Sequence, residues 1–305
     1  MEHFTFDYPR YLNAKESVDE RALNERVTER FVDELVDRDE HGLRVLEAGA
    51  GTGATLRRLL ERLGPREGPG EIRYCFVEER ADNLRVARDQ LQEWASATGY
   101  GLSEDADRIV LDGRGTAALL DLVRVDFVQK DVFEYLENRP GDPFDAIIAQ
   151  ALLDIVDLDA ALETMASHLR AGGLWYLPIH FDGVTALEPT IDPTLDQTIE
   201  EHYHRSMNDP QTGRHLLTSL RRTGAHLLDV GASDWIVFGS DGEYPSDEDY
   251  FLKCIIYFIL NELQGSEYDN DINIIEWARQ RRSQIRRGEL IYLAHQIDVC
   301  ARMSR

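Results

Sequence analysis

Apolar positions in the middle of the chain occur in short continuous runs, and between these runs they recur at intervals of three and four residues. The continuous runs predict strands at 43–47, 72–77, 123–129, 146–149 and 174–179. The intervals of three and four predict helices between the strands. Strands that alternate with helices pair in parallel and are covered on both faces. The pattern therefore predicts an α/β fold with a doubly wound, mainly parallel sheet.

Helical patterns also occur on both sides of this alternating region. Ser17 and Glu20 have the spacing of a capping box, and apolar residues from Val18 to Leu35 follow at helical intervals, which predicts one helix beginning near Ser17. Two long helical patterns are expected after residue 247. The last of them is followed by an apolar stripe at Leu290, Leu293, Ala294 and Ile297, which we interpret as a helix that packs on the sheet or forms a dimer interface.

Two further segments modify the predicted sheet. Residues 99–120 predict an irregular insertion with one short strand. The apolar runs within 226–238 are joined by Gly231, Ala232 and Ser233, which predicts a β-hairpin and therefore an antiparallel last strand. We divide the chain into an N-terminal helical cap (1–41), a central domain (42–240) and a C-terminal helical extension (241–305). A polar insertion at about 181–214 is expected to overhang the strand ends.

The negative charge of the chain restricts the classes of partner that it is expected to bind. There are 57 acidic and 33 basic residues, which gives a formal net charge of −24. Negative charge of this size repels polyanions and disfavours nucleic acid or an anionic membrane as a partner. The only lysines are Lys15, Lys130 and Lys253. An acidic, lysine-poor surface favours a protein adapted to high salt, and a GC-rich genome that favours arginine is the alternative explanation.

The absence of a membrane-spanning run, a secretion signal and paired cysteines leads to predictions about location and metal content. No apolar run reaches the roughly 18–20 residues of a spanning helix, and the first residues lack the basic start and apolar stretch of a secretion signal. We therefore expect a cytoplasmic protein. Cys75, Cys254 and Cys300 lie apart in apolar segments, without paired spacing or a nearby histidine ligand. Buried free thiols and no metal site are expected.

The stretch VLEAGAGTGAT at 45–55 joins the first predicted strand to a helix through three glycines, at 49, 51 and 53. Glycines let the backbone approach a ligand closely, and the following helix presents unpaired N–H groups and partial positive charge. A nucleotide-like ligand is therefore expected. Because GAGTGA also satisfies the dinucleotide fingerprint G-x-G-x-x-A, an NAD(P)-dependent oxidoreductase is an alternative.

Carboxylates at the ends of three predicted strands favour S-adenosylmethionine over a dinucleotide. Glu47 precedes the glycines, where an anion suits an ammonium group better than a pyrophosphate. Glu78 ends the second strand and can accept from both ribose hydroxyls of either ligand. Asp131 follows the third strand and can accept from an adenine amino group, while Val132 packs on the ring. The antiparallel last strand, which ordinary dinucleotide domains lack, supports the same choice.

These motifs resemble those of class I S-adenosylmethionine-dependent methyltransferases. VLEAGAGTG is similar to the family's first motif, FVEERADNL to its acidic second-strand end and FVQKDV to its adenine-binding position. FDAIIAQALLDIVDLDAALETMASHLRAGG is similar to its fourth strand, the following helix and the turn after it. The resemblance covers about 43–238. It implies a Rossmann-like seven-stranded sheet with an antiparallel last strand, and S-adenosyl-L-methionine as cofactor with S-adenosyl-L-homocysteine as product.

The resemblance also implies a set of cofactor contacts. Glu47 would bind the methionine amino group directly or through water, and Gln150 would lie at the fourth strand's end beside the methyl group. The implied contacts are Glu47, Gly49, Ala50, Gly51, Thr52, Gly53, Glu78, Glu79, Asp131, Val132 and Gln150. Taken singly, a glycine here can serve strand–helix packing, and Asp131 can be a helix N-cap.

The fourth strand ends in Gln150-Ala151-Leu152-Leu153-Asp154, without the Pro-Pro-Tyr that signals methylation of amide or base nitrogens. This resembles the small-molecule branch of the family, so the expected reaction is in-line methyl transfer to a small molecule. Segments that overhang the strand ends supply the candidate residues. The expected substrate contacts are Tyr8, Tyr11, Asp154 and His202, and the candidate catalytic residues are His180, His204 and Tyr203.

Several interpretations stay open for these candidates. A histidine can act as a base near neutral pH, but a buried structural role is an equal alternative for His180. Only one of His202 and His204 is expected to face the pocket. A non-catalytic partner subunit that binds the cofactor is a further alternative, because no motif specifies a base. The arginines at 279, 281, 282, 286 and 287 form either a solvated helix face or a docking patch for an anionic substrate or partner.

Overall fold

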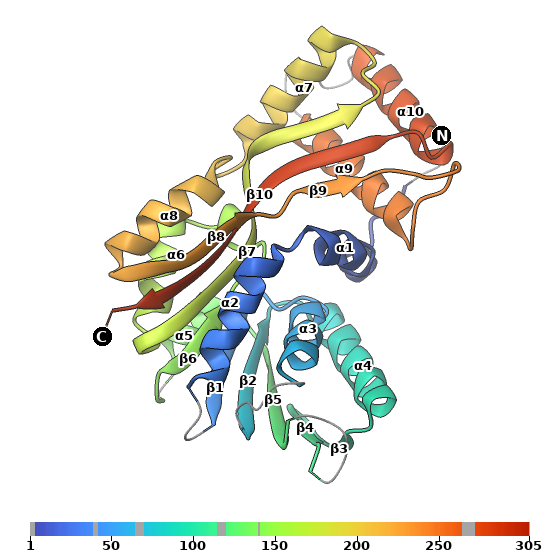
Figure 1. The fold of residues 1–305 in the computed structure, drawn as a ribbon. Coiled ribbons are helices and arrows are strands. Elements are labelled where there is room, and N and C mark those ends of the chain that lie inside the picture. Colours follow the sequence, from blue (N-terminus) through green and yellow to red (C-terminus); the bar gives the residue numbers. More distant parts are fainter. Residues whose placement is uncertain are drawn as a thin grey trace.

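The computed structural model of the chain describes residues 4–38, 42–64, 70–114, 120–139, 141–263 and 272–304. Within these ranges, the centre of the protein is a mixed ten-stranded sheet (Figure 1). Its strand order is β3-β4-β5-β2-β1-β6-β7-β10-β8, and the short β9 pairs with β10. Strands β5, β2, β1, β6 and β7 run parallel. The predicted fold class is confirmed, with more strands than the seven expected.

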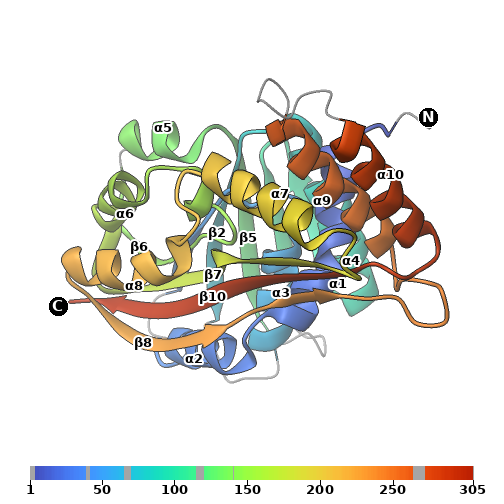
Figure 2. The same ribbon diagram turned by 90° about the horizontal axis from the view of Figure 1, so that it is seen from above.

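Helices cover both faces of the parallel strands (Figure 2). The strands are β1 (Leu43–Ala48), β2 (Glu71–Glu78), β5 (Leu122–Gln129), β6 (Phe144–Ile148) and β7 (Leu169–Glu188). One face is covered by α2 (Glu25–Val36), α3 (Ala54–Leu63) and α4 (Ala81–Thr98), and the other by α5 (Val132–Glu137), α6 (Leu158–Ala166) and α8 (Thr212–Arg222). Successive side chains of a strand point to opposite faces, so Val45 packs in the first core and Leu46 in the second. Because both faces of the sheet are covered, apolar residues predominate in these strands, although β1, β2 and β5 also contain charged residues.

The N-terminal region contains two helices, α1 (Tyr8–Ala22) and α2, instead of one helix that begins near Ser17. Helix α1 begins after Asp7, whose side chain accepts a hydrogen bond from the backbone N–H of Arg10, and Pro9 lies in its first turn. Ser17 lies inside α1 and donates its hydroxyl hydrogen to Glu248 Oε1 at 2.7 Å. The capping-box prediction is therefore wrong, because this serine bonds to another helix and caps none.

The last strand, β10 (Ile291–Met303), corrects two predictions. β8 (Ala225–Ala232) and β9 (Trp235–Val237) form no hairpin in the described sheet, because both pair in succession with one edge of β10. The apolar stripe at 290–297 belongs to this strand and not to a helix. In the first part of β10, burial has a period of two, and the buried residues there include Tyr292, Ala294, Gln296 and Asp298. Since two of these are polar, the two-residue period is hidden in the sequence.

The far edge of the sheet is also more regular than the sequence predicts. β3 (Gly101–Asp105) and β4 (Arg108–Asp112) form an antiparallel hairpin, where one short strand was expected. β4 in turn pairs antiparallel with β5. This hairpin lies away from the carboxyl ends of the central strands and does not line the cavity described below.

Two expectations from composition can be compared with the structure. Cys75, Cys254 and Cys300 are free and buried, as predicted. Burial raises the pKa of the Cys75 thiol to about 11, so this thiol stays protonated at neutral pH.

In the described part of the chain, no helix is both long enough and apolar enough to cross a membrane.

Beyond the carboxyl ends of the central strands, β7 and β10 continue as paired arms that carry a second layer of helices (Figures 1 and 2). This layer contains α1, α7 (Pro193–Ser206), α9 (Glu248–Leu263) and α10 (Ile272–Arg286). It has its own hydrophobic core around Phe251, Ile256 and Trp277. Arg281 of α10 is 0% exposed and donates to Asp196 Oδ1 of α7 at 2.7 Å. This arginine therefore joins two helices and is not part of a solvated face.

Candidate active site

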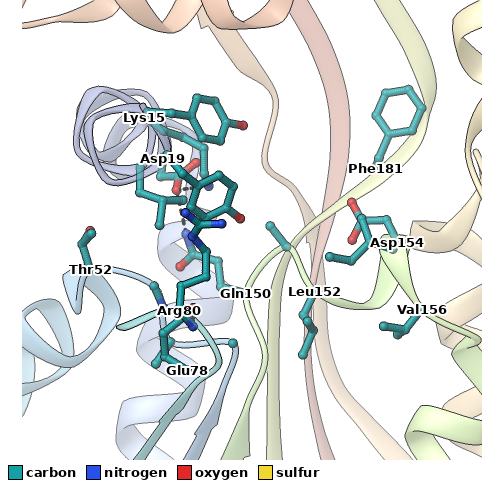
Figure 3. A pocket seen from close by; sticks show the side chains of 18 of the residues that line it. Lys15, Asp19, Thr52, Glu78, Arg80, Gln150, Leu152, Asp154, Val156 and Phe181 are labelled. Atoms are coloured by element: carbon teal, nitrogen blue, oxygen red, sulfur yellow. Dashed lines mark hydrogen bonds and ion pairs between the residues drawn. The ribbon is translucent and has the colours of Figure 1, made fainter. Parts of the chain in front are cut away.

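A cavity of about 850 Å³ lies between the carboxyl ends of the central strands and the helical layer (Figure 3). Its lower wall is formed by the glycine turn after β1, the ends of β2 and β6 and the start of α5. Its upper wall comes from α1, α7, α9 and the arms of β7 and β10. The predicted residues that line it are Tyr8, Tyr11, Glu47, Gly49, Ala50, Gly51, Thr52, Glu78, Glu79, Asp131, Val132, Gln150, Asp154 and Tyr203.

The turn after β1 brings the backbone close to the cavity. Gly49, Gly51 and Gly53 have φ values of +65°, +57° and +83°, a region that residues with a Cβ rarely adopt. A Cβ at Gly51 would also lie 3.1 Å from Leu12 Cδ1 of α1. Gly53 is the N-cap of α3 and does not line the cavity. The backbone conformation therefore favours glycine at all three positions, and at Gly51 the Leu12 side chain of α1 would also have to shift for a larger residue.

Glu78, at the end of β2, is held in place by three donors. Its Oε2 accepts from the backbone N–H of Gly51 at 2.9 Å, and its Oε1 accepts from the backbone N–H of Arg80 at 2.9 Å. Asn83 Nδ2 donates to the same Oε1 at 3.1 Å. A carboxylate fixed in this way at the strand end is pre-organised to accept further hydrogen bonds from a ligand.

Glu47, at the end of β1, is 2% exposed and lines the cavity. Its Oε2 accepts a hydrogen bond from the Tyr74 hydroxyl at 2.7 Å. Burial raises the pKa of Glu47 to about 7, against the lowering effect of its hydrogen bonds and of Arg58. A cationic ligand group beside this carboxylate would restore its charge, so the position suits an ammonium.

Asp131 has the capping role considered for it from the sequence, and its side chain also reaches the cavity. Its Oδ1 caps α5 by accepting from the backbone N–H groups of Phe133 and Glu134, each at 2.9 Å. The same residue lines the cavity beside the buried Val132. Within the described residues, Asp131 Oδ2 makes no hydrogen bond, so one oxygen is free for a ligand.

A buried polar network joins α1 to the end of β6 above the glycine turn (Figure 3). Lys15 Nζ lies 2.5 Å from Asp19 Oδ2, and these residues are 7% and 3% exposed. Asp19 also accepts from Gln150 Nε2 at 2.7 Å and from Trp235 Nε1 at 2.9 Å. Gln150 Oε1 accepts from Thr55 Oγ1 at 3.0 Å. The network thus fixes the Gln150 side chain at the strand end.

Sequence reasoning missed Lys15, Asp19 and Trp235, although all three line the cavity. The one available signal was a lysine four residues before an aspartate, in a chain that has few lysines. Such pairs are common on exposed helix surfaces, so the spacing does not indicate burial.

The three candidate histidines do not line the cavity. His180 is fully buried inside β7, because this strand does not end at residue 179 as predicted. Burial lowers the pKa of His180, so its ring is neutral at neutral pH. His204 Nε2 lies 3.0 Å from Thr185 Oγ1, and His202 Nε2 lies 3.2 Å from a backbone carbonyl of α9. The structure therefore gives none of them the position expected of a base.

Three predicted tyrosines do line the cavity: Tyr8, Tyr11 and Tyr203. Tyr203 faces it and its helical neighbours do not, because successive residues of an α-helix are rotated by about 100°. Burial raises the pKa of Tyr203 to about 12, with Glu262 and Asp154 acting in the same direction. Burial also raises the pKa of Tyr8 and of Tyr11. All three hydroxyls therefore keep their protons at neutral pH and can donate hydrogen bonds.

A family model described as a methyltransferase domain matches residues 20–184. The chain belongs to this family. The matched region contains the glycine turn and the strand ends that carry Glu47, Glu78 and Asp131. The predicted resemblance to S-adenosylmethionine-dependent methyltransferases is thus confirmed, together with the enzyme class and the cofactor. A search of curated proteins found no match for this methyltransferase.

Solved structures resemble the methyltransferase over most of its length. A Bacillus halodurans protein assigned to the methyltransferases is 12% identical, with a TM-score of 0.50 over 92% of this chain and 100% of that chain. A SAM-dependent methyltransferase from Thiobacillus denitrificans, solved with S-adenosyl-L-homocysteine, is 14% identical. Its TM-score is 0.46, over 98% of this chain and 100% of that chain. The geranyl diphosphate C-methyltransferase of Streptomyces coelicolor is 13% identical. Its TM-score is 0.42, over 91% of this chain and 76% of that chain. At 12% identity, the likeness to the Bacillus halodurans protein concerns the fold alone.

Proposed function

We propose that this methyltransferase moves a methyl group from S-adenosylmethionine to a small-molecule acceptor bound in the same cavity. One observation carries the proposal. Glu47, Glu78 and Asp131 lie at the carboxyl ends of three neighbouring strands, β1, β2 and β5, and line one cavity together with the backbone of the glycine turn. Each carboxylate suits a different part of one nucleoside that carries an amino acid.

The residues fit this cofactor in chemical detail. Glu47 is a buried carboxylate with a raised pKa, which suits the methionine ammonium. Glu78 is held by backbone and amide donors and keeps acceptor capacity for the ribose hydroxyls. Asp131 offers its free oxygen to the adenine amino group, and Val132 packs against the ring. A side chain at Gly51 would contact Leu12 of α1, so glycine keeps this part of the turn open.

The chain itself has to orient the acceptor and exclude water. When bound, S-adenosylmethionine supplies an electrophilic methyl group on a positively charged sulfur. Holding reactants in a productive orientation can be worth about 7–11 kcal/mol. We assign this task to the upper wall, where α1 is fixed to the β6 end through Asp19 and Gln150. Tyr203 keeps its proton and orients the acceptor by donating a hydrogen bond, so we do not propose it as a base.

The shape of the site supports a small acceptor. A volume of about 850 Å³ lies within the range of about 300–1,000 Å³ typical of small-molecule sites. The net charge of −24 disfavours a nucleic acid. The cavity also extends beyond the carboxylates to Phe181, Tyr203 and Tyr292, which a subunit that only bound the cofactor would not need.

Binding of S-adenosylhomocysteine tests this proposal. A ligand that binds only the folded state raises the melting temperature by mass action. We expect S-adenosylhomocysteine to raise the melting temperature of the full chain and NADH to leave it unchanged. Stabilisation by NADH alone, or by neither ligand, would overturn the proposal. Methyl transfer from labelled S-adenosylmethionine to a panel of small acceptors then tests catalysis itself.

A further inference from the structure

Asp154 is the residue of the cavity wall whose bonding is least complete. It lies on the short 3-10 helix η1 (Leu153–Ile155) after the end of β6 and points toward the side of Phe181 (Figure 3). Its Oδ1 is buried and has no hydrogen-bond partner among the described residues. A buried polar atom without a partner destabilises the folded state, and more so when it is charged. The position therefore lacks a hydrogen-bond donor that a ligand could supply.

Neither neighbouring side chain supplies this donor. His180 Nδ1 lies 3.2 Å from the Leu177 carbonyl oxygen, which only accepts, so Nδ1 carries the proton of the neutral ring. His180 Nε2 is then an acceptor, and it too is buried without a partner among the described residues. The Tyr203 hydroxyl is close enough for Asp154 to raise its pKa, but no hydrogen bond joins the two in the described structure. Acceptors therefore outnumber donors around Asp154.

The cationic side chains of the cavity wall are already paired. They are Lys15, Arg80 and Lys130. Lys15 forms an ion pair with Asp19 at 2.5 Å, Arg80 with Asp82 at 2.7 Å and Lys130 with Glu134 at 3.6 Å. By contrast, Asp154 and Glu262 line the cavity without an ion-pair partner among the described residues. Among the described residues of the wall, an acceptor with a carboxylate or phosphate would find no unpaired cationic side chain, whereas a cationic acceptor would find unpaired carboxylates.

The remaining wall on this side is largely aromatic. Tyr11, Phe181, Tyr203, Phe258 and Tyr292 line the cavity, and Tyr11 and Phe258 meet edge to face with ring centroids 5.2 Å apart. Aromatic faces attract ammonium groups, and they pack on the apolar body of a ligand. The wall thus combines a free carboxylate with aromatic rings.

From this combination we propose that the methyl acceptor is a small amine with an apolar body, and that Asp154 binds its nitrogen through an N–H hydrogen bond. The inference rests on the proposed function and names the acceptor class for the same cavity. An ammonium has to lose one proton before its nitrogen can act as a nucleophile. Asp154 takes that proton: an N–H bond breaks, an O–H bond forms on the carboxylate, and the electron pair stays on nitrogen.

Binding to the S-adenosylhomocysteine-loaded full chain tests the inference. The probes are 2-phenylethylamine, 2-phenylethanol and 3-phenylpropanoate, which share an aromatic body and differ in the polar group. We expect calorimetry to show the amine binding at least about tenfold more tightly than the alcohol or the carboxylate. Equal or tighter binding of either competitor, or no amine binding at millimolar concentration, would overturn the inference.

Two variants distinguish the specific effect of the Asp154 carboxylate on amine binding from the effect of the protein's overall negative charge. Asp154→Asn keeps the side-chain size and should lower amine affinity about 10- to 100-fold, as expected for a lost charge-assisted hydrogen bond. Glu163→Gln removes an equal charge from the exposed surface of α6, outside the cavity, and should leave amine affinity unchanged. Amine binding that is unaffected in Asp154→Asn would contradict the inference.

The affinity for S-adenosylhomocysteine distinguishes a failure of the proposed function from a failure of the proposed acceptor class. Both variants are expected to bind it as tightly as the wild type, which also shows that they are folded. If the wild type does not bind S-adenosylhomocysteine, the proposed function fails. If it binds S-adenosylhomocysteine but does not prefer the amine, only the acceptor class is wrong.

Discussion

Gln150 donates its Nε2 hydrogen to Asp19 Oδ2 at 2.7 Å, which ties the carboxyl end of β6 to helix α1. The two residues are 131 positions apart in the sequence. The same aspartate neutralises Lys15, so the residue that fixes the β6 end also compensates a buried charge. The roof of the cavity and the strand end beneath it are therefore one structural unit.

This unit predicts a large stability effect at Asp19. Asp19→Asn leaves the Lys15 ammonium buried without its counterion, which costs about 3–5 kcal/mol in comparable buried pairs. We expect urea denaturation to show a loss of that order in the free energy of unfolding. Replacing both partners, with Lys15→Met and Asp19→Asn together, should cost less than the single change because no unpaired charge remains.

The exposed ion pair between Arg279 and Glu276 provides the matched control for Asp19. These side chains are 70% and 45% exposed and lie 2.6 Å apart on α10. Because solvent screens such pairs, Glu276→Gln should leave the free energy of unfolding almost unchanged. Similar losses for Asp19→Asn and Glu276→Gln would contradict the importance given to the buried pair.

The raised pKa of Glu47 predicts pH-dependent cofactor binding. Burial raises this pKa to about 7, so the carboxyl is increasingly protonated as the pH falls below 7. An ammonium binds the charged form, so affinity for S-adenosylhomocysteine should fall as the pH is lowered from 8 to 6, by at most about tenfold per pH unit. Calorimetry across this range measures the slope, and Glu47→Gln should bind more weakly with a flatter profile. An unchanged slope in the variant would assign the titration to another group.

The same pKa has a consequence for stability without cofactor. The pKa of Glu47 is higher in the folded than in the unfolded chain, where it is 4.5, so ionising this group opposes folding. The stability present below pH 4.5 is then lost as the pH rises through about 7. We expect Glu47→Gln to be more stable than the wild type at pH 8, by the order of 1–3 kcal/mol in chemical denaturation. A less stable variant at that pH would contradict the assigned pKa.

Asp131→Ser separates the capping role of this residue from its proposed cofactor role. Serine caps helices about as well as aspartate, so the free energy of unfolding should change by less than about 0.5 kcal/mol. The variant lacks the free carboxylate oxygen, so affinity for S-adenosylhomocysteine should fall about tenfold. Asp157→Ser is the matched control, because Asp157 caps α6 and does not line the cavity. If both serine variants bind equally well, Asp131 is a cap only.

Gly51→Ala tests whether the turn is shaped for a ligand or only for folding. Alanine at a φ of +57° is strained, and its Cβ would approach Leu12. We expect a stability loss of about 1–2 kcal/mol together with weaker binding of S-adenosylhomocysteine. Gly99→Ala places alanine at a φ of +82° with no atom within 4 Å, away from the cavity. It should lower stability without changing affinity, and an equal affinity loss in both variants would argue against a ligand role for Gly51.

Local patterns were sufficient for much of the lower half of the molecule. The apolar residues of β1, β2 and β6 are buried on both faces of the sheet, and those of β5 mainly on one. A polar residue that lines the cavity lies at or just after the end of each strand. Because parallel strands place their carboxyl ends on one edge, Glu47, Glu78 and Asp131 could be predicted to meet there. These positions depend on strand ends and turn geometry, which neighbouring residues in the sequence determine.

Predictions failed where burial involved polar residues or distant partners. β10 was predicted as a helix because Gln296 and Asp298 are buried among apolar neighbours. Asp298 accepts from the backbone N–H groups of Asn24 and Ile179, a contact that no local pattern shows. For the same reason β7 was predicted to end before His180. The pairing of β10 with both β7 and β8 extends these strands into the arms of the upper layer.

The amino-acid sequence alone therefore determined the parallel sheet, the glycine turn and the carboxylates of the cofactor edge, because each depends on interactions over a few residues. The residues that close the cavity could be found only from tertiary contacts. They are Lys15 and Asp19 from α1, Trp235 from β9, and Asp154, which faces aromatic side chains of α7, α9 and the arms. These groups come together through long-range packing, whose partners leave no periodic trace in the sequence.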